Sequence, residues 1–301
     1  ETIRLCKAVF KDIYDVDIYT KGLVDTESIS KIYEQNEKEV EVFLEEVQST
    51  PLEINHDDCC ELYMLALRYE LQGNYSKAEK FCQMALNGFK KLHSEEGIAE
   101  SMLLLGTILE IQGRLLEAKN VLVECLNVAE ASGSMPIIGG CLQILGIIDE
   151  KRAMQLLSSQ SGTEEQISAL FDDAAMYFEE GLNVMGNCNN SLGIAHLQTS
   201  LATHFQMRIG VDKVENKTAV QTMCDLYRDS IKRFEHLGQE RHQATSSAML
   251  GQLLVHRKSS FFSRRKYRKE ARELLSFAVS TFEDFGDIQS ANGANKILEN
   301  L

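Results

Sequence analysis

The chain contains no tryptophan, only two prolines in 301 residues, and no apolar run long enough to span a membrane. Because proline costs about 3 kcal/mol inside a helix, its scarcity favours a nearly all-helical chain. An aromatic content of 7% leaves few platforms on which the bases of single-stranded nucleic acid could stack. The formal net charge of −14 opposes general binding to phosphate backbones. We therefore expect neither a membrane span nor general nucleic-acid binding.

Sequence motifs of common catalytic sites are also missing. The chain has no GxxxxGK[ST] loop, no GxGxxG after a strand, no GxSxG and no HExxH. The densest group of potential metal ligands is His56-Asp57-Asp58-Cys59-Cys60-Glu61. We interpret this group as a helix N-terminus, because a structural zinc site needs a second ligand pair elsewhere in the chain. The sequence therefore predicts no enzyme, no metal site and no cofactor.

The histidines and cysteines support the same interpretation. His196 and His204 are eight residues apart, about two helical turns, which is too far to share one metal ion, so each is expected to have its own polar or core partner. The eight cysteines lie mostly at apolar positions of the helical pattern and include no CxxC pair. Free cysteine behaves as a small buried hydrophobe, which favours a reducing compartment, the cytoplasm or the nucleus. Since the chain begins at Glu1, we expect a fragment of a longer protein.

The strongest positive signal is a pattern that recurs forty residues later. The first copy is Leu65-Ala66-x-x-Tyr69 followed by Gly73-x-Tyr75-x-x-Ala78, and the second is Leu105-Gly106-x-x-Leu109 followed by Gly113-x-Leu115-x-x-Ala118. A fixed period between about 20 and 50 residues is typical of stacked helical units that contact only their neighbours. The small residues Ala66 and Gly106 predict a close approach of the two helices of each unit. Gly73 and Gly113 predict tight turns that only glycine adopts easily.

Three further units follow, and in each the second helix comes later than the period predicts. Leu145-Gly146 begins the third unit in register, but its second helix is postponed by about sixteen residues, and in the last two units the delay is about nine and eight. The predicted repeats are about 58-96, 97-137, 138-190, 191-240 and 241-287, with insertions at about 152-167, 208-217 and 257-268. Within the first insertion, Leu157–Glu164 is expected to be a polar loop.

This pattern resembles the tetratricopeptide repeat (TPR), in its longer variant of about forty residues. That variant is found in kinesin light chains, in cell-polarity adaptors and in the C-terminal arrays of signal-transduction ATPases. The resemblance covers roughly residues 58-287 of this chain. It implies an all-α, right-handed TPR-like solenoid of about five helix pairs. The chain departs from the family in having no tryptophan in the first helices, no proline after the second helices, and the three insertions.

The two ends of the chain carry additional helical patterns. Residues 1-50 are predicted to form an acidic helical pair, and residues 1–58 contain fifteen Asp and Glu against six Lys and Arg. Residues 288-301 are predicted to form a single helix that covers the last apolar face of the solenoid.

The resemblance also implies where a partner would bind. In this family the first helix of each repeat lines the concave surface, and the corresponding outward positions here define a predicted groove. They are Tyr63, Leu67, Glu70, Leu71, Glu100, Leu103, Leu104, Thr107, Glu110, Gln143, Ile147, Glu150, His196, Thr199, Thr203 and Gln206. This set is apolar with acidic borders, which favours a basic or amphipathic peptide over a C-terminal carboxylate. Alternatively, part of the apolar set packs against the acidic N-terminal helices.

The last insertion carries a basic patch with a net charge of +6 between Lys258 and Arg272. Its members are Lys258, Arg264, Arg265, Lys266, Arg268 and Lys269. The functional interpretations are a nuclear-import stretch, a surface for an anionic partner, or a switch controlled by phosphorylation of Ser259, Ser260 or Ser263. The alternative is a solvated helix extension that balances an acidic molecule.

These observations lead to a first functional hypothesis and two competitors. The first is a non-catalytic adaptor or scaffold that binds a peptide or helical segment of a partner protein. The second is a C-terminal sensor array of a larger signalling ATPase. The third, an enzyme on a helical scaffold with His196, His204 or Cys60 as the reactive group, has the least support. The sequence does not identify the partner or the oligomeric state.

Overall fold

The computed structural model describes residues 55–212, 217–256 and 261–301 of the chain. Within these ranges the chain forms eleven helices and no strand. The helices are α3 (His56–Leu71), α4 (Tyr75–Lys91), α5 (Glu95–Ile111), α6 (Leu115–Ser132), α7 (Met135–Ser159), α8 (Glu164–Asn187), α9 (Ser191–Asp212), α10 (Lys217–His236), α11 (Glu240–His256), α12 (Phe261–Asp284) and α13 (Ile288–Glu299). The predicted acidic helical pair at residues 1-50 lies outside the described residues.

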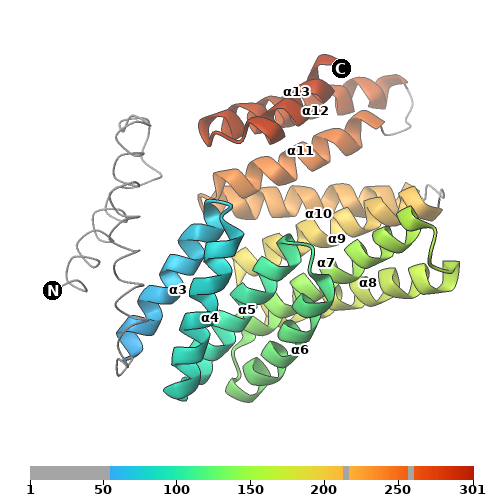
Figure 1. Ribbon diagram of the computed structural model, residues 1–301. Helices are drawn as coiled ribbons and strands as arrows, with labels where there is room; N and C mark the ends of the chain where they lie inside the picture. Colours follow the sequence, from blue (N-terminus) through green and yellow to red (C-terminus); the bar gives the residue numbers. More distant parts are fainter. Residues whose placement is uncertain (1–54, 213–216, 257–260) are drawn as a thin grey trace. The chain divides into compact units, whose positions relative to one another are not determined.

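The helices stack as consecutive antiparallel pairs (Figure 1). Each helix packs against the next one in the chain, and first helices also pack against first helices: α3 against α5, α5 against α7, and α7 against α9. The pairs α3–α4 to α11–α12 therefore form a two-layered all-α solenoid of five units, as the sequence predicts. The terminal helix α13 packs on α12 and α11 and buries Ala291 and Ala294 against them.

The recurring small residues and turns have the structural roles that their spacing predicts. A Cβ atom added to Gly106 would lie 2.5 Å from Leu122 on the paired helix, so only glycine fits at this contact. Gly113 has a φ of +78° in the turn between α5 and α6, a conformation that disfavours any residue with a side chain. In the preceding pair, Tyr69 and Phe81 stack with ring centroids 5.3 Å apart. The interior of each pair therefore follows directly from the repeated sequence.

The acidic cluster at residues 56–61 is the start of a helix. Asn55 caps α3 by accepting a hydrogen bond from the backbone N–H of Asp58, while the Asp58 carboxylate accepts one from the backbone N–H of Asn55. Such a reciprocal capping box satisfies two backbone donors that the first turn of a helix leaves unpaired. The interpretation of this cluster as a helix N-terminus is confirmed.

The first insertion lengthens helices and adds little loop. Helix α7 has 25 residues and α8 has 24, whereas α5 has 17 and α6 has 18. The link between α7 and α8 is residues 160–163, so the expectation of a polar loop over Leu157–Glu164 is wrong at both ends. The added turns are helical because Ala153 on α7 packs with Ile167 and Phe171 on α8, which gives them a small core of their own. The turn between α7 and α8 consequently projects beyond the turn between α5 and α6 (Figure 1).

Candidate interaction surface

In the first two repeats, most of the predicted groove residues whose side chains are described lie on one face of α3 and α5 and keep part of their surface in water. Tyr63 and Leu67 on α3 are half-buried, as are Leu103 and Thr107 on α5. We call the face that carries these residues, together with Glu70 and Glu100, the first-helix face. Large side chains that are neither packed away nor fully hydrated are typical of binding surfaces.

Leu104 does not contribute to this face as predicted. Leu104 is only 7% exposed, and it therefore belongs to the core of the α5 pair and is not accessible to a partner. The sequence pattern could not separate it from Leu103, because adjacent apolar residues on a helix both satisfy the expected spacing. The side chain of Leu71 lies outside the described set.

The first-helix face is acidic, and its titratable groups are desolvated. Burial raises the pKa of Glu100, and the nearby Glu96 adds to the effect. Burial also raises the pKa of Glu70, with the positive charge of Arg241 on α11 acting in the opposite direction. The pKa of Tyr63 is raised to about 12, by burial first and then by Glu100. A positively charged group that approached this face would stabilise the ionised carboxylates.

The position of Glu70 recurs at Glu110 and Glu150, where the carboxylate is buried. Glu110 on α5 pairs with Lys151 on α7 and is 5% exposed. Glu150 on α7 is 4% exposed, and its Oε1 lies 2.9 Å from Nδ1 of His204 on α9. Burial raises the pKa of Glu150, while the bond to His204 lowers it. Both carboxylates join one repeat to the next, so they are not the open groove residues that the sequence predicted.

His204 has the core partner that its position predicts. Besides its bond to Glu150, its ring makes edge-on contacts with Phe171, Phe178 and Phe205 at centroid distances between 5.8 and 6.0 Å. His196, two turns earlier, lies against Phe234 and His242, with ring centroids 5.0 and 4.5 Å away. Burial, and to a smaller extent the neighbouring His242, lower the pKa of His196 to about 4. The two histidines therefore occupy separate environments.

The remaining predicted residues of α7 and α9 also bridge neighbouring helices. Gln143 donates to Ser200 Oγ at 3.0 Å, and Thr199 Oγ1 lies 2.9 Å from Ser246 Oγ on α11. Thr203 Oγ1 lies 3.0 Å from the Tyr227 hydroxyl, which also donates to Gln206 at 3.5 Å. Gln143 and Thr199 thus join one repeat to the next, whereas Thr203 and Gln206 bond within the α9–α10 pair. Ile147 is half-buried and packs beside the α8–α9 core.

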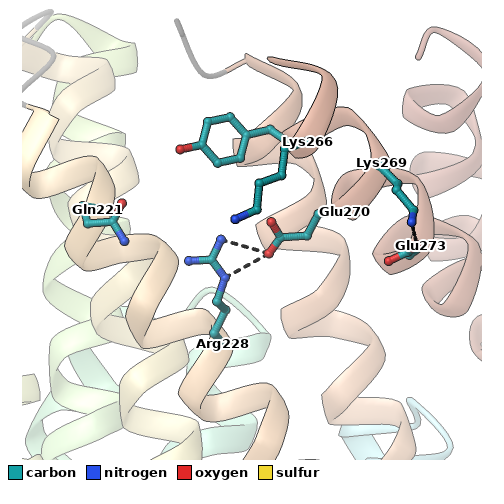
Figure 2. A pocket seen from close by; sticks show the side chains of 7 residues that line it. Gln221, Arg228, Lys266, Lys269, Glu270 and Glu273 are labelled. Carbon is teal, nitrogen blue, oxygen red and sulfur yellow. Dashed lines mark hydrogen bonds and ion pairs between the residues drawn. The ribbon is translucent and has the colours of Figure 1, made fainter. Parts of the chain in front are cut away.

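The basic patch lies partly within the described residues. Lys258 is outside them, and the side chain of Arg264 is not described, whereas Arg265 and Arg268 are exposed on α12. Lys266 and Lys269 line an open cleft of about 600 Å³ between α10 and α12 (Figure 2). In this cleft Arg228 bonds to Glu270 at 2.9 Å, and Lys269 lies 3.9 Å from Glu273. Most charged side chains in this cleft therefore lie close to an oppositely charged side chain of the same cleft, as expected for a solvated helix extension.

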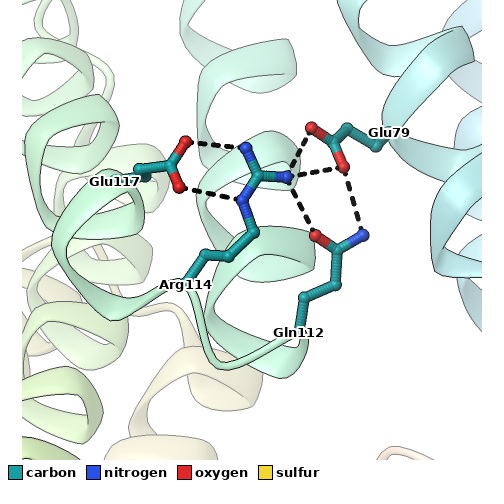
Figure 3. A network of polar contacts seen from close by, with 4 residues as sticks. All are labelled: Glu79, Gln112, Arg114 and Glu117. Atoms are coloured by element: carbon teal, nitrogen blue, oxygen red, sulfur yellow. Dashed lines mark hydrogen bonds and ion pairs between the residues drawn. The ribbon is translucent and has the colours of Figure 1, made fainter.

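A second polar network fixes the turn between α5 and α6 (Figure 3). Arg114 contacts Glu79 on α4 at 2.7 Å and Glu117 on α6 at 2.7 Å, and Gln112 donates to the same Glu79 at 3.1 Å. The hydrogen bonds that Arg114 donates to Glu117 and then to Glu79 raise the pKa of its guanidinium. Arg114 thus pairs with Glu79 and Glu117 within the network, which holds the turn between α5 and α6 in place.

Residues 55–212, 217–256 and 261–301 contain neither a candidate metal site nor a candidate membrane-spanning helix. No group of three or more histidine, cysteine or acidic side chains there could hold a metal ion. No helix in the same ranges is long and apolar enough to cross a membrane.

One surface feature is not predicted from the sequence: a hollow of about 400 Å³ beside the added turns of α7. Met154 and Met207 line it, and neither was among the predicted site residues. The signal was present in principle, because Met154 continues the helical spacing of Ile147 and Glu150. Met154 falls within the predicted insertion at about 152-167, which was not predicted to continue the helix.

Comparisons with known proteins agree with this architecture. Residues 58–131 match the sequence model of the tetratricopeptide repeat. No curated protein matches the chain in sequence. The structure is similar to the apo form of RapI, with a TM-score of 0.57 at 10% identity, over 100% of this chain and 97% of that one. It is also similar to a Rap protein complexed with Competence and Sporulation Factor, with a TM-score of 0.52 at 14% identity, over 90% and 68%.

A third similar structure is a signal-transduction ATPase with a tetratricopeptide repeat sensor from Pyrococcus horikoshii. The TM-score is 0.54 at 14% identity, and the match covers 98% of this chain but 43% of the ATPase. At such identities the comparisons establish the fold, which is one typical of protein-interaction scaffolds, and they indicate no catalytic family. The chain is therefore a TPR-like α-solenoid, in which residues 58–131 match the tetratricopeptide repeat itself.

Proposed function

We propose that this chain is a non-catalytic adaptor or scaffold whose first-helix face binds a basic or amphipathic segment of a partner protein. The observation that carries the proposal is the set of half-buried apolar side chains on successive first helices, Tyr63, Leu67 and Leu103, next to desolvated carboxylates. An amphipathic helix or extended peptide offers the matching chemistry, because its apolar side would cover the leucines and its cations would face Glu70 and Glu100.

The position of this face within the array supports the proposal. The same positions on α7 and α9 are used for contacts between repeats, as Glu150 with His204 and Thr199 with Ser246 show. On α5, the hydroxyl of Thr107 bonds, within the described part of the chain, to the Leu103 carbonyl of its own helix. A partner therefore has more unengaged side-chain surface to bind on α3 and α5.

The test is affinity capture of partner proteins by wild-type chain and by Leu67→Lys and Leu103→Lys variants. Each substitution places a cation beside the acidic side chains that would bind the partner's cations, so we expect at least about a tenfold loss of capture, equivalent to 1.4 kcal/mol. The matched control is Leu116→Lys on α6, where the leucine is already 66% exposed. Circular dichroism establishes that all three variants keep their helix content.

If both first-helix variants retained wild-type capture while folded, the proposed surface would be wrong. Equal losses in the Leu116→Lys control would likewise show that the effect comes from added charge and not from the face itself.

The alternative is a sensor array of a larger signalling ATPase in a reducing compartment such as the cytoplasm. The similarity to the Pyrococcus horikoshii ATPase, which has a tetratricopeptide repeat sensor, is the observation that favours it. The full-length coding sequence tests it, because a phosphate-binding loop must then precede the solenoid. An upstream region without that loop would remove this alternative and leave the adaptor hypothesis.

A further inference from the structure

The added turns of α7 leave one side of that helix without a neighbour. Helices α5 and α7 start forty residues apart, at Glu95 and Met135, but α7 continues eight residues longer than the period requires. At 1.5 Å per residue the overhang is about 12 Å. On one side the overhang packs against α8 through Ala153 and Phe171. On the side of α5 and α6 the shorter pair has already turned, at Gly113.

The uncovered side forms the hollow of about 400 Å³, which we call the ledge. Its walls are apolar and come from three helices: Leu115 at the start of α6, Ile147 and Met154 on α7, and Met207 on α9. Met154 is 40% exposed although it continues the buried spacing of its helix. Unbranched methionine side chains adapt their shape to whatever enters such a site.

The charged groups of the ledge indicate what would enter it. Glu150 and Lys151 are the two charged residues among those that line it in the described part of the chain. Lys151 is already paired with the buried Glu110. One oxygen of the Glu150 carboxylate, Oε1, lies 2.9 Å from Nδ1 of His204, and burial raises the pKa of this carboxyl. A cation that entered the ledge would therefore stabilise the ionised form of Glu150.

We propose that the ledge is a docking site for a lysine or arginine side chain presented by a helical segment of a partner protein. The four-carbon or three-carbon stem of such a residue would lie along Ile147, Met154 and Met207, and its cationic head would reach toward Glu150. Charge complementarity selects this occupant, because Glu150 places a carboxylate beside the apolar wall of the ledge, whereas the charge of Lys151 is matched by Glu110. The inference rests on the proposed function, since a partner must supply the side chain.

The experiment uses small probes that need no knowledge of the partner. Pentylammonium and 1-pentanol share a five-carbon chain and differ in the charge of the head group. Both are titrated into the folded chain carrying ¹³C-labelled methionine methyl groups. We expect the methyl signals of Met154 and Met207 to shift, with the ammonium binding about fivefold or more tightly than the alcohol because its hydrogen bond to Glu150 is charge-assisted. Met176, which is 67% exposed on α8, serves as the internal control and should not shift.

Two variants separate charge from shape. Glu150→Gln should remove the preference for the ammonium, so that both probes bind alike. Because Glu150 is buried and this variant could lose stability, Met154→Lys provides a second test at an exposed position, where the new cation should abolish ammonium binding. Met176→Lys is the matched control and should bind as wild type does.

Equal affinity of wild-type chain for the two probes, or no shift at Met154 and Met207, would overturn the proposal. Shifts of the same methyl groups that depend on protein concentration without any probe would instead identify a second copy of this chain as the occupant, and would also overturn it. The outcome is independent of the first-helix face. If neither probe binds but Leu67→Lys loses partner capture, only the proposal for the ledge is rejected. If the ammonium binds as expected but Leu67→Lys keeps wild-type capture, only the proposal for the first-helix face is rejected.

Discussion

The regular pairs α3–α6 and the extended pairs α7–α10 use the same repeated positions in different ways. Glu70, Glu110 and Glu150 occupy one position in three successive repeats, yet Glu70 is half-buried, Glu110 pairs with Lys151, and Glu150 bonds to His204. Thr107 on α5 bonds within its own helix, whereas Thr199 on α9 also contacts Ser246 on α11. The environment of a repeated residue is therefore decided by the next helix in the stack, and of these three carboxylates only Glu70 stays partly open.

The largest expected effect tests whether the extension of α7 and α8 is a packed core. Phe171 is fully buried between Ala153 and Ile167, so Phe171→Ala should lower the free energy of unfolding by about 3–5 kcal/mol through lost burial and a residual cavity. Urea unfolding followed by circular dichroism measures this. The matched control is Phe277→Ala on α12, where the ring is 37% exposed and the loss should be smaller. Similar losses in the two variants would mean that the extension contributes little to stability.

The second prediction uses the low pKa of His196, on an extended pair. Its pKa of about 4 in the folded chain lies below the usual 6.5, so the unfolded chain binds the proton more readily. Stability from the neutral imidazole is therefore complete above about pH 6.5 and is lost as the pH falls toward 4, by up to about 3 kcal/mol. The measurement is the unfolding free energy against pH for wild-type and His196→Phe chains.

The difference between those two curves isolates His196 from the carboxylates that titrate in the same range. The His196→Phe curve should fall less steeply between pH 6.5 and 4, while His236→Phe, at an exposed position, should follow wild type. Parallel curves for wild type and His196→Phe would contradict the burial-driven shift.

The smallest effect compares two threonines directly. Thr107 and Thr199 each donate to the carbonyl four residues earlier, at 2.9 and 3.0 Å, but only Thr199 also lies 2.9 Å from a buried hydroxyl on another helix, that of Ser246. Thr199→Val should therefore cost about 1 kcal/mol more than Thr107→Val, because it leaves Ser246 without its partner. Thermal unfolding of both variants measures the difference. A cost for Thr107→Val as large as that for Thr199→Val would contradict the distinction between the two regions.

Much of the fold could be predicted because it depends on residues near each other in sequence. Gly106 faces Leu122 and Tyr69 stacks on Phe81, and both contacts lie within one repeat. The accessible residues of the first-helix face were harder to predict, because contacts between repeats decide which of the candidate side chains are buried. Leu103 and Leu104 look alike in the pattern, but only Leu104 is buried. The added turns of α7 were mistaken for a loop because Ser158 and Ser159 are polar, although they continue a helix that packs through Ala153.

The sequence by itself determined the all-helical class, the forty-residue repeat and the close contacts inside each pair. These follow from helical periodicity and from small residues at fixed positions, which are local properties of the chain. The tertiary structure alone decided which polar residues stay open, which partners Glu110 and Glu150 have, and that α7 overhangs α5 to form the ledge. Those features depend on helices that are forty or more residues apart, and on the unequal lengths of neighbouring pairs, which the period of the pattern does not encode.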